Sequence, residues 1–248
     1  MEMNGMMGGL YRIAEWIMRL ATINLLWIFC SIPFIFLIFN QLLTTSVETG
    51  MALESIYDLI FWMLPPLIVA PFCFFPASAA LCTVARKWIM GDEDVPLFKT
   101  FFRGFKSNYK QSMLGGLFFS FILIVLLINV QFYADKGSLI SVVSYLFIVM
   151  VLLLVAAVMN YLSMLTHFEM KTMTLIKNSI LFTIGRPLTS LMLLVGNFVL
   201  LYVSFYKFNF LVPFFMGSLM GAFSFWCFYK VLQRIQDKEE LLQNSKEA

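Results

Sequence analysis

Charged side chains are scarce in this sequence, and long segments of it contain none. Asp, Glu, Lys and Arg make up 12% of the 248 residues, whereas hydrophobic residues make up 61%. That balance excludes a soluble globular domain. Six charge-free segments cover residues 20–40, 59–85, 112–133, 139–164, 187–206 and 208–229. Each is predicted to be a membrane span, because a helix needs about 20 mostly apolar residues to cross the hydrocarbon core.

Groups that carry out chemistry are equally scarce. The only histidine is His167, which with Glu169 forms either a small polar site or an ordinary interfacial pair. The four cysteines (Cys30, Cys73, Cys82 and Cys227) lie in apolar segments without CxxC spacing, which supports neither a disulfide framework nor a zinc site. P-loop, HExxH and GxSxG motifs are absent.

Membrane enzymes and ion-coupled pumps usually carry ionisable groups inside their spans, and here none lies near the middle of one. We therefore expect no enzymatic activity, no catalytic residue, no cofactor and no metal ion. The predicted fold is all-α: a single membrane domain over residues 1–248, built as a polytopic transmembrane helix bundle of about six spans.

The few cations present are distributed asymmetrically. If the N-terminus is cytoplasmic, 15 of the 17 Lys and Arg residues fall in cytoplasmic segments, and only Lys136 and Lys207 fall outside. This positive-inside bias predicts that both termini are cytoplasmic and that the protein is a multi-pass protein of the plasma membrane. The cations flank apolar spans, which favours attraction to anionic lipid of the bilayer over binding of nucleic acid.

Amphipathic segments are predicted on the cytoplasmic face. Residues 1–19 are predicted to form an interfacial helix that precedes the first span. Residues 230–248 are predicted to form a polar tail. A weaker amphipathic helix follows the fourth span and ends near Gly185. Its apolar stripe is predicted to comprise Met173, Ile176, Ile180 and Ile184.

The cytoplasmic loop at residues 86–110 has the clearest pattern. Acidic residues before Pro96 predict a helix start, and from Phe98 onward the residues separate at the helical period. An aromatic arc holds Phe98, Phe101, Phe102, Phe105 and Tyr109, and a basic arc holds Lys99, Arg103, Lys106 and Lys110. We expect this helix either to lie in the lipid interface or to dock onto a partner protein.

Several residues within the spans suggest how the helices pack. Four prolines in the second span (Pro65, Pro66, Pro71 and Pro76) predict a broken or kinked helix, which serves either packing or a substrate cavity. Five amides (Asn24, Asn129, Gln131, Asn160 and Asn197) either bridge helices or line a pathway for a neutral solute. Gly217, Gly221 and Ser224 predict close helix packing, within the protein or between copies in a homo-oligomer.

Three segments carry a resemblance to a known family. They read MNGMMGGLYRIAEWIMRL from residue 3, FPASAALCTVARKW from residue 75, and GDED from residue 91 followed by FKTF from residue 98. They resemble the YesL family of Gram-positive bacterial integral membrane proteins, whose domain has no assigned function. Members are often encoded beside carbohydrate ABC transporters and polysaccharide-degrading enzymes. The resemblance therefore implies, by association only, an accessory role in sugar import.

Two functions remain open at this point. The first is an accessory or regulatory protein that contacts transporter subunits at the cytoplasmic face. The alternative is a facilitative carrier that passes a neutral polar solute through a cavity at the helix break in residues 65–76.

Overall fold

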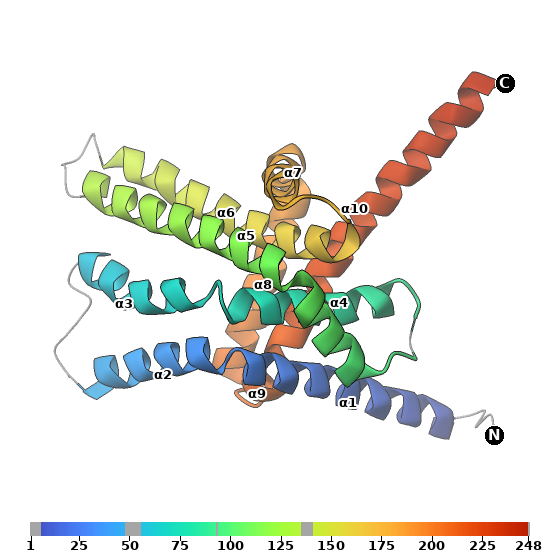
Figure 1. The fold of residues 1–248 in the computed structure, drawn as a ribbon, viewed down its shortest axis with the longest axis horizontal. Helices are drawn as coiled ribbons and strands as arrows, with labels where there is room; N and C mark the ends of the chain where they lie inside the picture. The colour runs from blue at the N-terminus through green and yellow to red at the C-terminus, as the bar shows by residue number, and fades with distance from the viewer. Residues whose placement is uncertain (1–5, 48–55, 93, 135–140, 248) are drawn as a thin grey trace.

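The computed structural model describes residues 6–47, 56–92, 94–134 and 141–247, and the regular structure in these ranges is helical (Figure 1). The helices are α1 (Met6–Cys30), α2 (Ile32–Val47), α3 (Ile56–Val69), α4 (Phe74–Ile89), α5 (Leu97–Ala134), α6 (Val142–His167), α7 (Thr172–Gly185), α8 (Pro187–Tyr202), the π-helical turn η1 (Val203–Lys207), α9 (Leu211–Phe214) and α10 (Met216–Glu247). The all-α prediction is confirmed for this part of the chain.

Four helical segments in the described ranges are long and apolar enough to span a membrane. They are Tyr11–Cys30, Leu97–Ala134, Val142–His167 and Pro187–Tyr206. A fifth span is possible if the bent pair of α3 and α4 counts as one, since these helices meet at an angle of 56°. By length and composition this is a multi-pass membrane protein with four or five candidate spans, and the predicted break in the second span is confirmed.

The sequence predicts an interfacial helix over residues 1–19 that leads into a span over residues 20–40, and residues 1–5 lie outside the described structure. Helix α1 runs without interruption from Met6 to Cys30, and the break comes later, at Ser31. Pro33 explains its position, because proline has no N–H to donate to the carbonyl of Phe29. The interfacial segment and the first span are therefore parts of one helix.

A sixth span over residues 208–229 is not among the candidates in the described residues. The chain there is divided between α9, which ends at Phe214, and α10, which begins at Met216, with Pro213 beside the break. Helix α10 offers only residues 216–229 before the charge at Lys230, fewer than the roughly 20 that a span requires. The predicted polar tail, residues 230–248, is helical to Glu247 as the second half of α10.

Helix α4 lies at the centre of the bundle and packs against α1, α5, α6 and α10. Its small residues make this possible: Ala77, Ala79 and Ala80 are fully buried. One apolar cluster joins α4 to α1 and the start of α5 around Trp27 and Phe101. Another joins α4 to α5, α6, α7 and α10.

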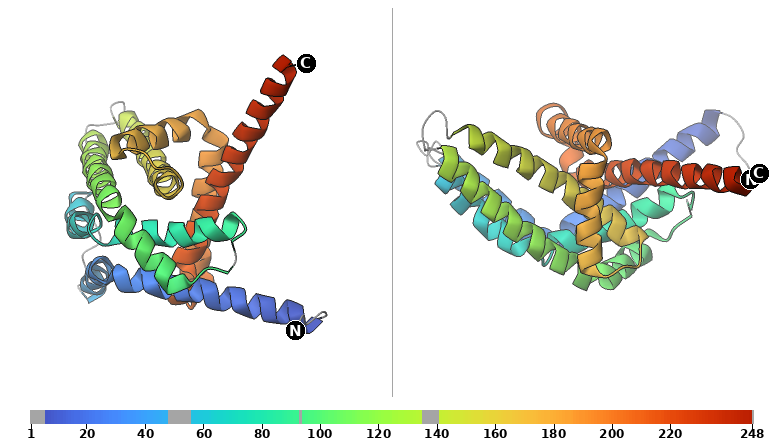
Figure 2. Two further views of the ribbon diagram at one scale, coloured as in Figure 1. Left: turned by 45° about the vertical axis from the view of Figure 1, so that its right-hand side comes forward. Right: turned by 90° about the horizontal axis from the view of Figure 1, so that it is seen from above.

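The helix ends are grouped in space. The end of α2, the start of α3, the end of α5 and the start of α6 lie at one end of the molecule, on the left of Figure 1. The start of α1 and the connection from α4 to α5 lie toward the opposite end. Figure 2 shows the second half of α10 projecting away from the other helices.

Candidate interaction surface at the start of α5

The helix predicted within residues 86–110 is present, but it is not a separate element. It forms the first turns of α5, a 38-residue helix that continues to Ala134. At about 1.5 Å per residue this helix is about 57 Å long, well beyond the ~30 Å of a hydrocarbon core. The start of α5 can therefore lie outside the core while its remainder crosses it.

The turn before α5 is set by the way α4 ends. Gly91 has a φ of +95°, which a residue with a side chain rarely adopts. The N–H of Gly91 donates to the carbonyl of Trp88 (3.1 Å) and that of Asp92 to the carbonyl of Lys87 (2.9 Å). These two hydrogen bonds make a Schellman motif, which ends α4 and reverses the chain toward Pro96.

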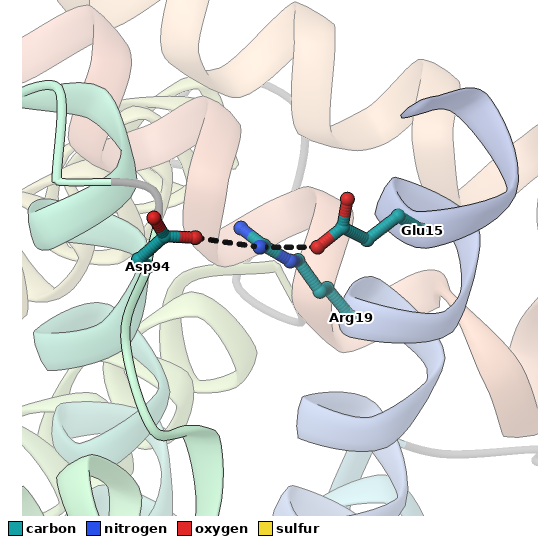
Figure 3. Close-up of polar contacts among 3 residues, drawn as sticks. All are labelled: Glu15, Arg19 and Asp94. Carbon is teal, nitrogen blue, oxygen red and sulfur yellow. Dashed lines mark hydrogen bonds and ion pairs between the residues drawn. The ribbon is translucent and has the colours of Figure 1, made fainter. Parts of the chain in front are cut away.

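An arginine ties this turn to α1. The Arg19 side chain lies between the carboxylates of Glu15 and Asp94, and its distance to Asp94 is 3.5 Å (Figure 3). Its guanidinium also lies over the ring of Trp16, 5.7 Å from the centroid. Because the Asp94 carboxylate is fully exposed, the ion pair contributes little to stability and serves mainly to position the turn.

The inner face of the start of α5 packs tightly on α4. Phe101 is completely buried, and a Cβ at Gly104 would lie 2.9 Å from side-chain atoms of Thr83. The Thr83 hydroxyl also accepts a hydrogen bond from the amide of Asn108 at 3.3 Å. These contacts fix the rotation of α5 about its own axis.

Tyr109 supplies a hydrogen bond that the backbone lacks at the bend between α3 and α4. In a continuous helix the carbonyl of Phe72 would accept a hydrogen bond from residue 76, but Pro76 has no N–H. The hydroxyl of Tyr109 donates to this carbonyl instead, at 3.2 Å. The bend is also closely packed, since a Cβ at Gly116 would lie 3.0 Å from the Cα of Pro71. These contacts favour a packing role for the bend over a substrate cavity.

Replacing Tyr109 by phenylalanine should destabilise the protein modestly, by about 1 kcal/mol, because the carbonyl of Phe72 loses its partner. The apparent Tm in detergent should fall by about 2–4 °C. Tyr145→Phe is the matched control, since the Tyr145 side chain is exposed on α6 and the loss of its hydroxyl should leave Tm unchanged. Equal unfolding temperatures for the two variants would contradict the assigned role.

The predicted aromatic arc is not a single exposed face. Phe101 is buried and Phe105 and Tyr109 are half-buried, whereas Phe98 and Phe102 are 61% and 46% exposed. The arc divides because α4 covers one side of α5, a contact that helical periodicity does not reveal. The surface that remains, termed the basic-aromatic stripe, comprises Phe98, Lys99, Phe102, Arg103, Lys106 and Lys110, all exposed.

Polar contacts hold the start of α5 against the end of α6. The Gln111 side chain donates to the carbonyl of Met170 at 2.9 Å, and the Tyr161 hydroxyl donates to the carbonyl of Gln111 at 2.6 Å. Arg86 at the end of α4 donates to the carbonyl of Thr166 at 2.6 Å. Sequence reasoning missed Arg86 in this role, since its partner is a backbone group 80 residues away.

His167 and Glu169 do not form an ion pair in the described structure. Glu169 is exposed, whereas the His167 ring packs against Phe168, with ring centroids 4.8 Å apart, and against residues of α10. Within the described ranges, no group of three or more His, Cys, Asp and Glu residues is placed to hold a metal ion.

The glycines predicted for helix packing contact other helices of the same chain. A Cβ at Gly217 would lie 2.8 Å from a ring carbon of Trp27, and one at Gly221 would collide with Leu81. Ser224 accepts a hydrogen bond from Asn197 at 3.2 Å. This face of α10 thus packs inside the bundle, against α1, α4 and α8.

Asn197, Asn160 and Asn24 bridge helices. Besides Asn197, Asn160 donates to the hydroxyl of Thr183 on α7 at 2.9 Å, and Asn24 bonds to backbone groups near the start of α10. Asn129 donates within its own helix, to the carbonyl of Val125. The buried side of α7 comprises Leu175, Ile176, Ser179 and Thr183. Met173 and Ile184 of the predicted stripe are exposed.

Comparison with known proteins supports the resemblance drawn from the sequence. A family model described as "Protein of unknown function, DUF624" matches residues 20–130. Three proteins of Bacillus subtilis (strain 168), each described as uncharacterized, are similar to this chain. YteU is 27% identical over 95% of this chain and 90% of its own length. YesL is 28% identical over 94% of this chain and 95% of its own length. YesV is 32% identical over 60% of this chain and 72% of its own length. No solved structure matches.

Proposed function

This chain belongs to the DUF624 family. We propose that it is a non-enzymatic accessory protein of the plasma membrane. Its basic-aromatic stripe would contact subunits of a carbohydrate ABC transporter on the cytoplasmic side. The observation that carries the proposal is the rigid presentation of that stripe by a helix whose opposite face is buried.

The stripe has the composition of a protein-binding surface. It combines two exposed aromatic rings with Arg103 and three lysines over about 20 Å of helix. Aromatic residues and arginine contribute most strongly to protein interfaces, and four cations complement an acidic partner. Because Phe101 and Gly104 already fix the helix, docking incurs little loss of conformational freedom.

The orientation follows from the charges. The start of α1 and the connection from α4 to α5 share one end of the molecule, and the basic residues of these segments favour the cytoplasm for that end. The stripe is then cytoplasmic, where the ATPase and the cytoplasmic loops of a transporter are accessible. The family resemblance associates such proteins with carbohydrate transporters and supports this choice of partner.

Co-purification from native membranes in mild detergent tests the proposal. The wild-type protein should retain transporter subunits identified by mass spectrometry. The double variant Phe98→Ser and Phe102→Ser should retain at least about ten-fold less, because two exposed anchor rings are lost while the buried Phe101 is untouched. Tyr11→Ser is the matched control, since Tyr11 is an exposed aromatic on α1, away from the stripe.

Two outcomes would overturn the proposal. One is a wild-type protein that retains no transporter subunit. The other is solute uptake into liposomes that contain only the purified protein, which would identify it as a carrier.

A further inference from the structure

A groove lies between the end of α6, the whole of α7 and the middle of α10. Its volume is about 410 Å³, within the usual range for small-molecule sites. The walls are apolar and include Met164 on α6, Phe182 on α7, and Leu232 and Ile235 on α10. This groove is separate from the basic-aromatic stripe on α5.

The depth of the groove in the membrane can be inferred from the helices that form it. One candidate span ends at His167, and the next begins at Pro187. The groove is lined almost entirely by residues between these two points and by α10 from Phe228 onward. It therefore lies where the hydrocarbon core gives way to the headgroups.

The lining is charged at one place only. Arg186, between α7 and α8, is the sole charged residue among those that line the groove, and Asn178 is the other polar one. Arg186 is exposed, so its long side chain can reach a headgroup while its stem follows the apolar wall. Lys177 and Arg234 are two further cations on the helices that form the walls.

We propose that this groove binds one anionic phospholipid, with an acyl chain between α7 and α10 and the phosphate paired with Arg186. An apolar cleft with a single cation matches a molecule with a hydrocarbon chain and an anionic head. The thioethers of Met164 and Met170 adapt readily to a flexible chain. A second copy of the protein fits less well, because a stable interface needs about 800 Å² on each partner, far more than this groove offers.

Two adjacent residues allow binding of the lipid's acyl chain and binding of its headgroup to be tested separately. Gly185 lines the groove, and a Cβ there would meet no atom within 4 Å. Gly185→Phe adds a ring at the wall of the groove, and its Cβ has room there. Arg186→Gln removes the cation and leaves the apolar walls intact. Arg103→Gln, an equivalent change on the basic-aromatic stripe, is the control.

Native mass spectrometry of the full-length protein in detergent measures the result, with phosphatidylglycerol and phosphatidylcholine as probes. The wild-type protein and Arg103→Gln should retain one phosphatidylglycerol in preference to phosphatidylcholine. Arg186→Gln should weaken phosphatidylglycerol binding about five-fold, the equivalent of the ~1 kcal/mol expected for one basic residue at an anionic membrane surface. Gly185→Phe should abolish retention of both lipids.

Three results would overturn the proposal. The first is equal retention of the two lipids by the wild-type protein. The second is a preference for phosphatidylglycerol that persists in Arg186→Gln. The third is a dimer that Gly185→Phe dissociates without loss of lipid, which would assign the groove to a second copy of the chain.

Discussion

Replacing Asn24 by leucine is expected to destabilise the protein by about 2–4 kcal/mol, more than any other single substitution proposed for it. Asn24 is completely buried in α1. Its side-chain amide donates to the carbonyls of Val212 (3.3 Å) and Pro213 (2.7 Å), and its oxygen accepts from the N–H of Ser218 (3.0 Å). Leucine of similar size would keep the packing but leave three backbone groups without these bonds.

The size of this effect follows from the break between α9 and α10. Helix α10 begins at Met216, so the N–H of Ser218 is one of the donors that have no partner within the helix. The carbonyls of Val212 and Pro213 lose their helical partners at the same break. From α1, the Asn24 side chain forms hydrogen bonds with backbone groups on both sides of this break. A buried polar group left without a partner costs about 1–3 kcal/mol of stability. Hydrogen bonds between membrane helices often contribute less than about 1 kcal/mol each.

Thermal or denaturant unfolding of the purified protein in detergent measures this effect. Asn129→Leu is the matched control: the same substitution at a residue whose amide donates within its own helix, to the carbonyl of Val125. The control should unfold close to the wild-type temperature, whereas Asn24→Leu should unfold several degrees lower. If both variants match the wild-type protein, Asn24 does not hold the break together.

Replacing Gly115 by alanine is expected to destabilise the protein by about 1–3 kcal/mol through overpacking. A Cβ at this position would lie within the space of the Tyr161 ring. Tyr161 cannot move aside easily, because it is completely buried, its hydroxyl bonds to the carbonyl of Gln111, and its ring packs edge-on against Phe119. The collision should separate α5 from α6.

Gly185→Ala is the matched control, because no atom lies within 4 Å of the added Cβ. Alanine favours the helix by up to about 1 kcal/mol relative to glycine, so this control should unfold at the wild-type temperature or above it. Gly115→Ala should unfold several degrees lower in the same detergent. The packing argument fails if Gly115→Ala is as stable as Gly185→Ala.

The success of the sequence-based predictions depends on the range of the interactions involved. The spans predicted over residues 112–133 and 187–206 fall within α5 and within the segment from α8 through η1. The described part of the span predicted over residues 139–164 overlaps α6. The bend between α3 and α4 also follows from the sequence. Hydropathy and proline act through neighbouring residues, so the sequence carries these signals directly.

The errors arise where an effect depends on a distant segment or on an unexpected helix boundary. A span over residues 208–229 is not among the candidates in the described residues, because the chain breaks after Phe214. The described part of residues 1–19 continues into the first candidate span as one helix, α1. Phe101 falls on the predicted aromatic arc, yet it is buried against α4. The pattern distinguishes aromatic from basic residues but carries no information about which aromatic rings α4 covers.

The sequence by itself determined that this chain is a helical membrane protein and where most of its apolar helices lie, because the length and composition of a span are local properties. Only the tertiary structure decided which surfaces remain open. The rotation of α5 exposes Phe98 and Phe102 and buries Phe101, and the crossing of α7 and α10 creates the groove beside Arg186. The partners of Asn24 lie 188 residues or more along the chain, a separation over which local periodicity has no influence.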